Sequence, residues 1–521
     1  MSNKFLNNLY QYDTTTENGA LSHSTSGSAL LDYFSKCGTY RDRTLAEVFA
    51  SMGQLWSESP ELCLRMIFYN RLITRQEKGE FATERVQKGQ GNRGEFRASI
   101  QWLAKYQPDS LYKNLWLIPV VGTWKDLWHE EIIDHLDQDS VFQLISKGIQ
   151  DTFDRALLSK YLPRIRSKAN TRHERHLRLN RFALDLIKYL GWSPKEYRQF
   201  KSSGKAHTFQ QLMSQQRFED IRFNEIPGKA LFQWVNQRGK DGKTIVERQN
   251  MEDRYLDWIK TQPTAKFTGY VYELMKVVNT QLSAAQAYTV NKQFEHLLAV
   301  ARQDGSIQEN VWCALDTSGS MKFPVADTTA YDICISLGIY FSSLNQGAFQ
   351  DHVIMFDQKS RALKLSGEFV DKVRRITTSN VAWGNTNFQS VIDEIVRIRK
   401  RKTDIPIEDF PTTLLVVSDM QFDPAGENTQ TNYEEAMTKL AAVGLPKMKI
   451  VWWWVTGRGA DIPNKLDDEG VILIGGFDGA ILSLLLGGEA KSKNAPHTIR
   501  LTPYEAMQAA LEQEILELIS V

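Results

Sequence analysis

The sequence predicts an α plus α/β protein, in which an all-α region is followed by a doubly wound parallel sheet. Apolar residues recur at spacings of three and four from Ala29 to about Ala301, without a convincing strand among them. After the polar break at residues 302–310, short continuous apolar runs alternate with helical segments. Such alternation is typical of a parallel sheet covered by helices. The boundary is therefore expected near residue 305.

Composition limits the class of protein. A chain of 521 residues has room for about two to four domains. The net charge of +1 excludes a protein that is basic throughout, so any nucleic-acid site must be a local patch. Neither an apolar leader nor a run of about 18 apolar residues occurs, which predicts a soluble, cytoplasmic protein without a membrane partner. Four widely spaced cysteines predict buried thiols in a reducing compartment: Cys37, Cys63, Cys313 and Cys334.

The first half divides into an arm and a helical region. Residues 1–27 are polar and rich in Ser, Thr, Asn and Gly, which predicts a flexible N-terminal arm. Residues 28–305 form the helical region, with helices joined by short polar connections. Stacked antiparallel helix pairs are the expected architecture, either as an α-solenoid or as a closed ring. No strict repeat period is present.

The second half, residues 306–521, is predicted to hold the sheet. Five strands are expected at Val311–Leu315, His352–Phe356, Thr412–Ser418, Lys449–Val455 and Val471–Gly475. Helices are expected at Ala326–Ser343, Phe388–Arg399, Tyr433–Val443, Ala480–Leu486 and, last, Pro503–Ile519.

Oxygen-bearing side chains lie in three loops of the predicted sheet domain. The first strand ends at Asp316, and Ser318 and Ser320 come next; Thr386 precedes a helix, and Asp419 follows another strand. Parallel strands gather their carboxyl ends at one edge of a sheet, where ligands bind. Two carboxylates and three hydroxyls suit a hard cation, Mg²⁺ or Mn²⁺, with a position left open for a carboxylate or phosphate from a partner. Alternatively, the hydroxyls only cap the next helix.

This pattern resembles the metal-ion-dependent adhesion site of von Willebrand factor A domains, in residue type and in loop order. The resemblance implies that Asp316, Ser318, Ser320, Thr386 and Asp419 hold the metal. Many such domains use this site to hold a partner's acidic group, and few of them are enzymes. The resemblance therefore also implies a binding site and not a catalytic one. Asn387 departs from relatives that have an acidic residue after the threonine, which affects the expected metal affinity.

Residues of the helical half extend the resemblance to the Ro autoantigen (TROVE-module) RNA-binding proteins. The matching motifs are Tyr69-Asn-Arg71, Gly89-Gln-Gly-Asn-Arg-Gly94, Gly122-Thr-Trp124-Lys-Asp126, Phe223-Asn-Glu-Ile-Pro227-Gly-Lys229 and Ser418-Asp419-Met-Gln-Phe-Asp423. The resemblance implies a ring of HEAT-like helical repeats next to a von Willebrand factor A domain. It further implies that single-stranded ends of misfolded RNAs enter the ring and that structured non-coding RNAs bind its basic outer surface.

One segment of the helical half is strongly basic. Between Lys160 and Lys205 there are 13 basic and 3 acidic residues, a balance of 13 − 3 = +10. The candidate RNA-binding residues are Arg164, Arg166, Lys168, Arg172, His173, Arg175 and His176, which can contact phosphates by charge and bidentate hydrogen bonds. Aromatic residues are not interleaved with most of this stretch, so recognition of backbone and shape is expected. A solvated helix face whose charges pair with acids elsewhere is the alternative.

Two motifs resemble functional signatures without their context. The glycines of Gly89-x-Gly91-x-x-Gly94 match a dinucleotide fingerprint, but a charged segment precedes them where a buried strand is required, which favours a phosphate-contacting or hinge loop. The histidines His173 and His176 are one residue short of the zinc-protease spacing. A third feature, Trp452–Trp454, is interpreted as a buried strand.

The favoured function is a non-catalytic, Ro-like RNA-binding protein acting in RNA quality control or sequestration. A metal-dependent protein-interaction adaptor that binds no RNA is the second hypothesis. A metal-assisted hydrolase using Asp316 and Asp419 is the third, and it lacks an evident base or nucleophile in the sequence.

Overall fold

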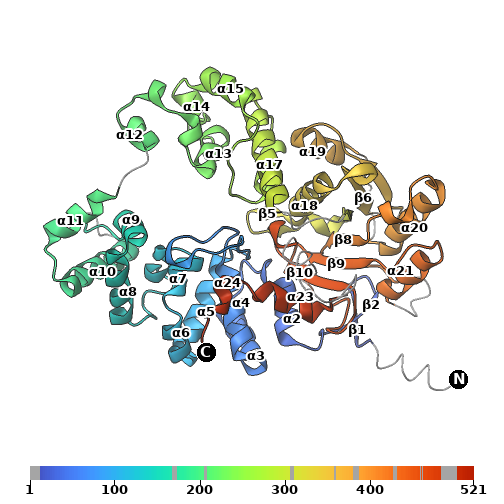
Figure 1. The fold of residues 1–521 in the computed structure, drawn as a ribbon, viewed down its shortest axis with the longest axis horizontal. Coiled ribbons are helices and arrows are strands. Elements are labelled where there is room, and N and C mark those ends of the chain that lie inside the picture. The colour runs from blue at the N-terminus through green and yellow to red at the C-terminus, as the bar shows by residue number, and fades with distance from the viewer. Residues whose placement is uncertain are drawn as a thin grey trace. The chain divides into compact units, whose positions relative to one another are not determined.

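A computed structural model describes residues 12–521 except 167–172, 205–207, 305–309, 357–358, 380–385, 426–430, 458, 460 and 483–500. The chain forms two compact units (Figure 1). The first, called the sheet unit here, comprises the chain up to Tyr40 together with Gln216–Ala510. The second, the helical unit, comprises Arg41–Gln215 and Leu511–Val521. Among the described residues, no helix is both long and apolar enough to cross a bilayer.

A six-stranded mixed sheet is the core of the sheet unit. The strands are β3 (Val311–Asp316), β6 (His352–Phe356), β7 (Arg361–Lys364), β8 (Thr413–Ser418), β9 (Lys449–Trp454) and β10 (Val471–Gly475), in the order β10-β9-β8-β3-β6-β7. All neighbours are parallel except β6 and β7, which are antiparallel. The five predicted strands are present. The antiparallel edge strand β7 was not predicted, because its residues are short of apolar side chains and only partly buried.

The central strands are continuously buried, as expected for strands covered on both faces. Every residue of β3 and β8 is buried, with Val311 opposite Thr413 and Leu315 opposite Val417. In β9, the side chains Trp452, Trp453 and Trp454 are at most 1% exposed, which confirms the interpretation of the tryptophan run as a buried strand.

Helices pack against the strands of this sheet. The helix α18 (Ala330–Leu344) packs on β3, β6 and β8, and α2 (Ala29–Cys37) packs on β9 and β10. The others that complete the sheet domain are α19 (Phe369–Thr378), α20 (Phe388–Arg401), α21 (Asn432–Ala441) and α23 (Pro503–Leu511). Most of the helix predicted from Ala480 to Leu486 lies outside the described residues.

The predicted domain boundary near residue 305 needs correction. Helices α13 (Gly228–Asn236), α14 (Ile245–Arg248), α15 (Glu252–Thr261), α16 (Val271–Val278) and α17 (Ala284–Asp304) belong to the sheet unit. The helix α16 packs against α18, and α17 packs against α19. Helical periodicity shows that each of these helices has an apolar face but does not show which element covers it, so the sequence placed all of them with the earlier helices.

The predicted flexible arm over residues 1–27 also needs correction, for the described residues 12–27. Strands β1 (Thr14–Thr15) and β2 (Leu21–Ser22) form a small antiparallel hairpin. The Thr16 hydroxyl donates a hydrogen bond to the Phe422 carbonyl (2.6 Å), and His23 forms a backbone bridge with Ile462. A polar segment of this kind is anchored by hydrogen bonds to distant loops, which composition does not reveal.

The helical unit is built from neighbouring helices joined by short connections. Its α-helices are α3 (Leu45–Glu58), α4 (Pro60–Arg71), α5 (Arg93–Tyr106), α6 (Pro108–Lys113), α7 (Leu117–Val121), α8 (Gln138–Gln150), α9 (Thr152–Tyr161), α10 (Glu174–Leu190), α11 (Pro194–Ser203), α12 (Thr208–Ser214) and α24 (Glu514–Glu517). The 3₁₀ turns η1 (Gly79–Phe81) and η2 (Trp124–Trp128) lie between helices of this unit. The helices α3, α4 and α5 pack on one another, as do α8 and α9.

The end of the chain returns to this unit. The helix predicted over Pro503–Ile519 is divided into α23 and α24 by residues 512–513. At the break, the Gln513 side chain accepts a hydrogen bond from the Lys88 N–H (2.7 Å) and donates one to the Lys88 carbonyl (2.8 Å). This paired contact with a distant loop explains the interruption, which the amphipathic pattern does not predict.

Candidate functional sites

The first candidate site lies at the carboxyl ends of β3 and β8, which are neighbours at the centre of the sheet. From β3 the chain continues to β6 on one side, and it later enters β8 on the other side. Such a reversal of strand order leaves a crevice where open α/β sheets bind ligands. Asp316 is the last residue of β3, and Asp419 directly follows β8. The two predicted carboxylates therefore lie together because of the strand order.

Short hydrogen bonds connect the residues of this crevice. The Ser318 N–H donates to Asp316 Oδ1 (2.9 Å), and the Ser418 hydroxyl donates to Asp316 Oδ2. The hydroxyl oxygens of Ser318 and Ser320 are 3.0 Å apart, and Ser320 also hydrogen-bonds to the Asp419 carboxylate. Asp316 has no exposed surface and Asp419 is 6% exposed. Four of the five predicted metal ligands thus form one connected group.

Thr386, the fifth predicted ligand, is attached to the same loops through the backbone. Its carbonyl accepts a hydrogen bond from the Asp423 N–H (2.9 Å), and the residue is 2% exposed. The next residue, Asn387, caps α20 by accepting a hydrogen bond from the Ser390 N–H (3.1 Å). The side chain that departs from the family pattern therefore has a helix-capping role.

The electrostatics of the crevice favour a cation. Burial raises the pKa of Asp316, and the nearby charge of Asp419 raises it further. Burial also raises the pKa of Asp419, to which the charge of Glu17 contributes. A buried pair of carboxylates is costly unless a positive charge compensates it. Among the described residues, His, Cys, Asp and Glu side chains nowhere gather in a group of three suited to a metal, so a cation here would depend on the serine and threonine hydroxyls.

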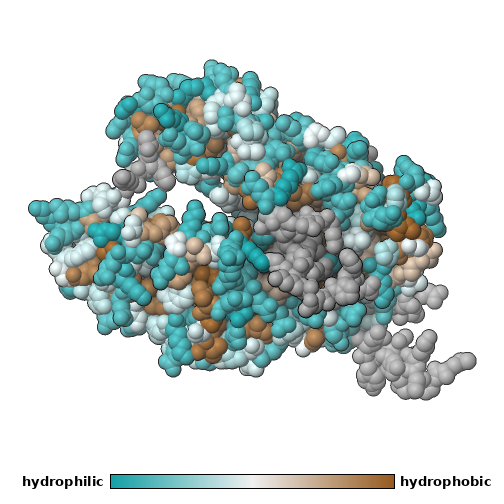
Figure 2. All heavy atoms as spheres, viewed as in Figure 1, coloured by the Kyte–Doolittle hydropathy of each residue, from teal (hydrophilic) through white to brown (hydrophobic). Residues whose placement is uncertain are grey.

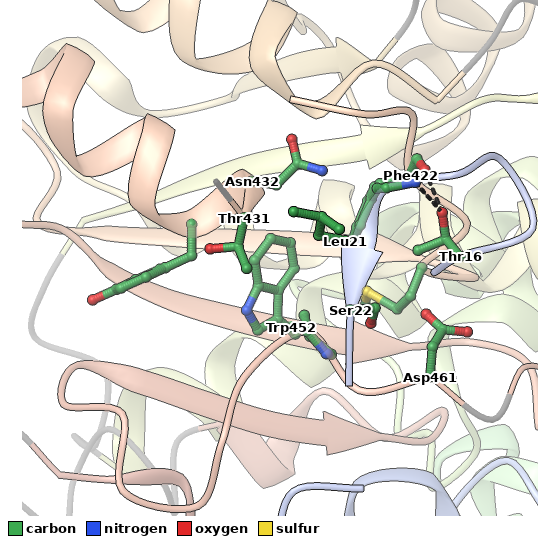
Figure 3. A pocket seen from close by; sticks show the side chains of 12 residues that line it. Thr16, Leu21, Ser22, Phe422, Thr431, Asn432, Trp452 and Asp461 are labelled. Atoms are coloured by element: carbon green, nitrogen blue, oxygen red, sulfur yellow. Dashed lines mark hydrogen bonds between the residues drawn. The ribbon is translucent and has the colours of Figure 1, made fainter. Parts of the chain in front are cut away.

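The N-terminal hairpin packs against the loop that follows Asp419. The Glu17 N–H donates to Gln421 Oε1 and the Asn18 side chain donates to the Gln421 carbonyl, both at 2.7 Å. Figure 3 shows Thr16 beside Phe422, and Leu21 and Ser22 near Trp452. The cavity left between them is about 10 Å³, roughly one water molecule. We therefore interpret this contact as structural packing that fixes the Asp419 loop.

The predicted RNA-binding residues occupy two places in the helical unit, and two of them, Lys168 and Arg172, lie outside the described residues. Arg166, His173, Arg175 and His176 are near one another: burial and the charges of Arg166, His173 and Arg175 lower the pKa of His176. The rings of His173 and His176 are 5.7 Å apart. Arg164 instead lies near Lys201, which also has Lys125 nearby.

Some charges of the basic segment are paired with acids, as the alternative interpretation expected. Arg178 forms ion pairs with Asp134 and Glu174, and Arg175 is 3.8 Å from Glu130. Arg164 and Arg166 are exposed and form no ion pair within the described part of the chain. The surface over α8 to α11 is largely hydrophilic in the view of Figure 2. Partial pairing therefore leaves a smaller basic surface than the sequence count implies.

The structure adds residues to this surface that the sequence did not single out. The ammonium groups of Lys125 and Lys160 are 4.6 and 5.5 Å from the centre of the Tyr161 ring. Lys201 donates a hydrogen bond to the Lys160 carbonyl (3.0 Å). We call Lys125, Lys160, Arg164 and Lys201 the lysine cluster. Lys125 belongs to the Gly122–Asp126 motif, so its position in that motif was the available signal.

The fold and the loop cluster define the sheet unit as an α/β protein with an oxygen-rich site at the carboxyl edge of its sheet. Residues 311–515 match a family described as a domain of unknown function (DUF7788), and residues 16–178 match another described in the same words (DUF2828). Neither description names an activity.

Two whole-chain similarities accompany these matches. The chain is 23% identical over 546 residues to "Uncharacterized protein L728" of Acanthamoeba polyphaga mimivirus, with 97% of this chain and 90% of the relative covered. It is also similar to the crystal structure of the Ro (RSR) protein of Deinococcus radiodurans, at 13% identity and a TM-score of 0.42, with 89% of this chain and all of that one covered.

Proposed function

We propose that the protein is a non-catalytic, Ro-like RNA-binding protein that holds single-stranded or structured non-coding RNA in or on a ring of helices. Its role would be RNA quality control or sequestration in the cytoplasm. The observation that carries the proposal is the lysine cluster, where cations gather on one surface of the helical unit. The motifs shared with Ro proteins point to the same function, and four buried free thiols support a reducing compartment.

Like charges that are held together without acids favour an anionic ligand. Burial lowers the pKa of Lys201 to about 8, and the charges of Arg164 and Lys125 contribute to that shift. Within the described residues, Lys125, Arg164 and Lys201 form no ion pair with a carboxylate. A phosphate in this position would compensate three charges that otherwise repel one another. Nucleic acids carry a phosphate on each nucleotide and can therefore place one at this position.

For the sheet unit we propose a site for Mg²⁺ or Mn²⁺ at Asp316, Ser318, Ser320, Thr386 and Asp419. The donor set supports it, since carboxylate and hydroxyl oxygens are the ligands of hard cations. The cation would supply charge compensation for the two buried carboxylates and attraction for a partner's acidic group. This chain's own residues orient that site: Ser418 and the Ser318 N–H hold the Asp316 carboxylate in place.

The proposal is tested by sequencing RNA that copurifies with the native full-length protein and by measuring the salt dependence of its retention. Recovered non-coding or fragmentary RNA, released progressively by salt, is the expected result. A preparation free of nucleic acid that also fails to bind added RNA would favour the adaptor hypothesis. Cleavage of RNA that requires Mg²⁺ and disappears in Asp316→Ala would contradict the non-catalytic assignment.

A further inference from the structure

A cavity of about 700 Å³ lies inside the helical unit, separate from the loop cluster of the sheet. Its walls come from η1, α8 and α9 and from the segment 116–124, all of which belong to one compact unit. Sites for small molecules have volumes of about 300–1,000 Å³ and combine apolar walls with a few polar groups. This cavity has the size and the lining of a binding site, and neither the sequence motifs nor the proposed function accounts for it.

Aromatic rings form much of its wall. Phe81 and Trp116 are stacked, with ring centres 4.8 Å apart and an angle of 23° between the planes. Trp124 is held by a hydrogen bond from its Nε1 to Asp154 Oδ1 (3.0 Å). Phe153 lines the cavity while 49% exposed, and Tyr161 lines it from the end of α9. Exposed rings around a cavity suit a flat ligand that can stack on them.

The packing that positions Trp124 depends on a glycine. A Cβ added at Gly148 would lie 2.8 Å from two carbon atoms of the Trp124 ring and 3.1 Å from Leu158. The ring therefore fits against α8 because residue 148 has no side chain. This close approach fixes the orientation of one aromatic wall before any ligand arrives.

Carboxylates are among the polar groups of the cavity, together with the cations Arg75, Lys78 and Lys147. Glu77 is buried and receives a hydrogen bond from Arg75 (2.8 Å), and Asp154 accepts the bond from Trp124. Burial raises the pKa of both carboxyls, and the charges of Asp151 and Glu80 contribute at Asp154. Carboxylate oxygens are hydrogen-bond acceptors, so they pair with the N–H groups of a ligand. They are unsuited to a ligand whose polar edge consists of acceptors.

Cations lie where the cavity reaches the lysine cluster. Tyr161 lines the cavity, and its ring is the one that Lys125 and Lys160 approach. Lys147 is also exposed at the lining. A ligand that consists of a flat ring with N–H groups and an attached anionic group would thus fit here. Its ring would lie in the cavity, and its anionic group would lie beside the lysines.

We propose that this cavity binds an unpaired nucleobase of a single-stranded RNA, stacked on its aromatic wall with the adjoining phosphate at the lysine cluster. The proposal rests on the RNA-binding function proposed above and adds a base-binding site to it. Bases with exocyclic amines, guanine first, match the carboxylate acceptors better than uracil does. A paired base is excluded because its N–H groups are already used and its faces are stacked.

The test measures binding of end-labelled, unpaired RNA oligonucleotides by fluorescence anisotropy, with the full-length protein. Phe81→Ala/Trp116→Ala should weaken binding of a guanine-containing oligonucleotide by about 5- to 150-fold, the range for loss of one stacked base. The same variant should bind an oligonucleotide of abasic nucleotides as the wild type does. Tyr106→Ala, at an exposed ring elsewhere in the helical unit, is the matched control and should bind both normally.

The outcomes separate the two proposals. Wild-type protein that binds no RNA overturns the proposed function and this inference with it. Wild-type protein that binds RNA, with an aromatic double variant that binds equally well, overturns the base-binding site alone. A measurement on unmodified protein covers the case in which the variant does not fold: RNA carrying one photoreactive thio-base should crosslink to peptides that line the cavity. Crosslinks confined to other peptides would refute the site.

Discussion

The guanidinium of Arg71 and the carboxylate of Asp126 form a buried ion pair, in which Arg71 Nε and Nη2 donate to Asp126 Oδ2 at 3.0 and 2.8 Å. Both side chains are at most 4% exposed. Asp126 also accepts the Thr123 N–H (3.0 Å), and a Cβ at Gly122 would lie 2.6 Å from its Oδ2. Two short motifs noted in the sequence, Tyr69–Arg71 and Gly122–Asp126, are thus two halves of one contact.

Removing one partner of this pair should strongly destabilise the protein. Asp126→Asn leaves the Arg71 charge buried without compensation, for which we expect a loss of about 3–5 kcal/mol. Urea unfolding followed by circular dichroism measures it. Glu61→Gln is the matched control: its pair with Arg65 is partly exposed, at 2.7 Å across one helical turn, and its loss should cost about 0.3–0.5 kcal/mol. Equal effects of the two substitutions would contradict the role given to Arg71.

Substitution in the loop cluster should weaken cation binding without unfolding the sheet unit. Asp419→Ala removes one of two carboxylates, so the affinity for Mg²⁺ or Mn²⁺ should fall about tenfold or more in isothermal titration calorimetry. The control is Asp467→Ala, an exposed acid of the same unit, which should leave the titration unchanged. If Asp419→Ala binds the metal like the wild type, the three-loop assignment is wrong.

Charge reversal in the basic segment should weaken RNA binding and reduce its dependence on salt. Arg164→Glu/Arg166→Glu removes two cations from the exposed surface, so the salt slope should decrease by about 1.4 if each contacts a single-strand phosphate. Arg374→Glu/Arg375→Glu changes the net charge equally on the exposed face of α19. Filter binding from low to moderate salt compares the two double variants with the wild type. If Arg164→Glu/Arg166→Glu has the salt slope of the wild type, the RNA binds at another surface.

RNA affinity should decrease as pH rises through about 8, because of Lys201. Its pKa in the free protein is lowered to about 8 by burial and by Arg164 and Lys125. A bound phosphate favours the charged form and raises that pKa, so binding takes up a proton and is weakened when protons become scarce. Affinity measured from about pH 7 to pH 9 should fall in the wild type and stay level in Lys201→Arg, which keeps its charge. A matching fall in Lys201→Arg would exclude Lys201 as the cause.

The glycine motif at residues 89–94 illustrates what a pattern alone leaves undecided. A Cβ at Gly89 would lie 2.5 Å from the Tyr69 carbonyl oxygen and 2.6 Å from that of Leu72. The Gly91 N–H donates to the Leu72 carbonyl at 2.9 Å, and Asn92 caps α5. The loop therefore packs against the end of α4. A residue with a side chain at position 89 would prevent this approach, so glycine is needed there for packing. The spacing of the glycines in the sequence does not distinguish this packing role from phosphate binding.

Elements that have a local signal can be predicted from the amino-acid sequence alone. Continuous apolar runs predicted five strands of the sheet. The residue types directly after Leu315 and Ser418 predicted its oxygen-rich edge, because a residue that follows a parallel strand lies at the carboxyl edge of the sheet. Features that depend on residues far apart in the chain became visible only in the fold. It placed α13–α17 with the sheet, anchored Thr16 and Glu17 on the Asp419 loop, and gathered Lys125 and Lys160 beside Tyr161. Those contacts form between residues that are far apart in the sequence. The local pattern around each residue does not indicate its partner.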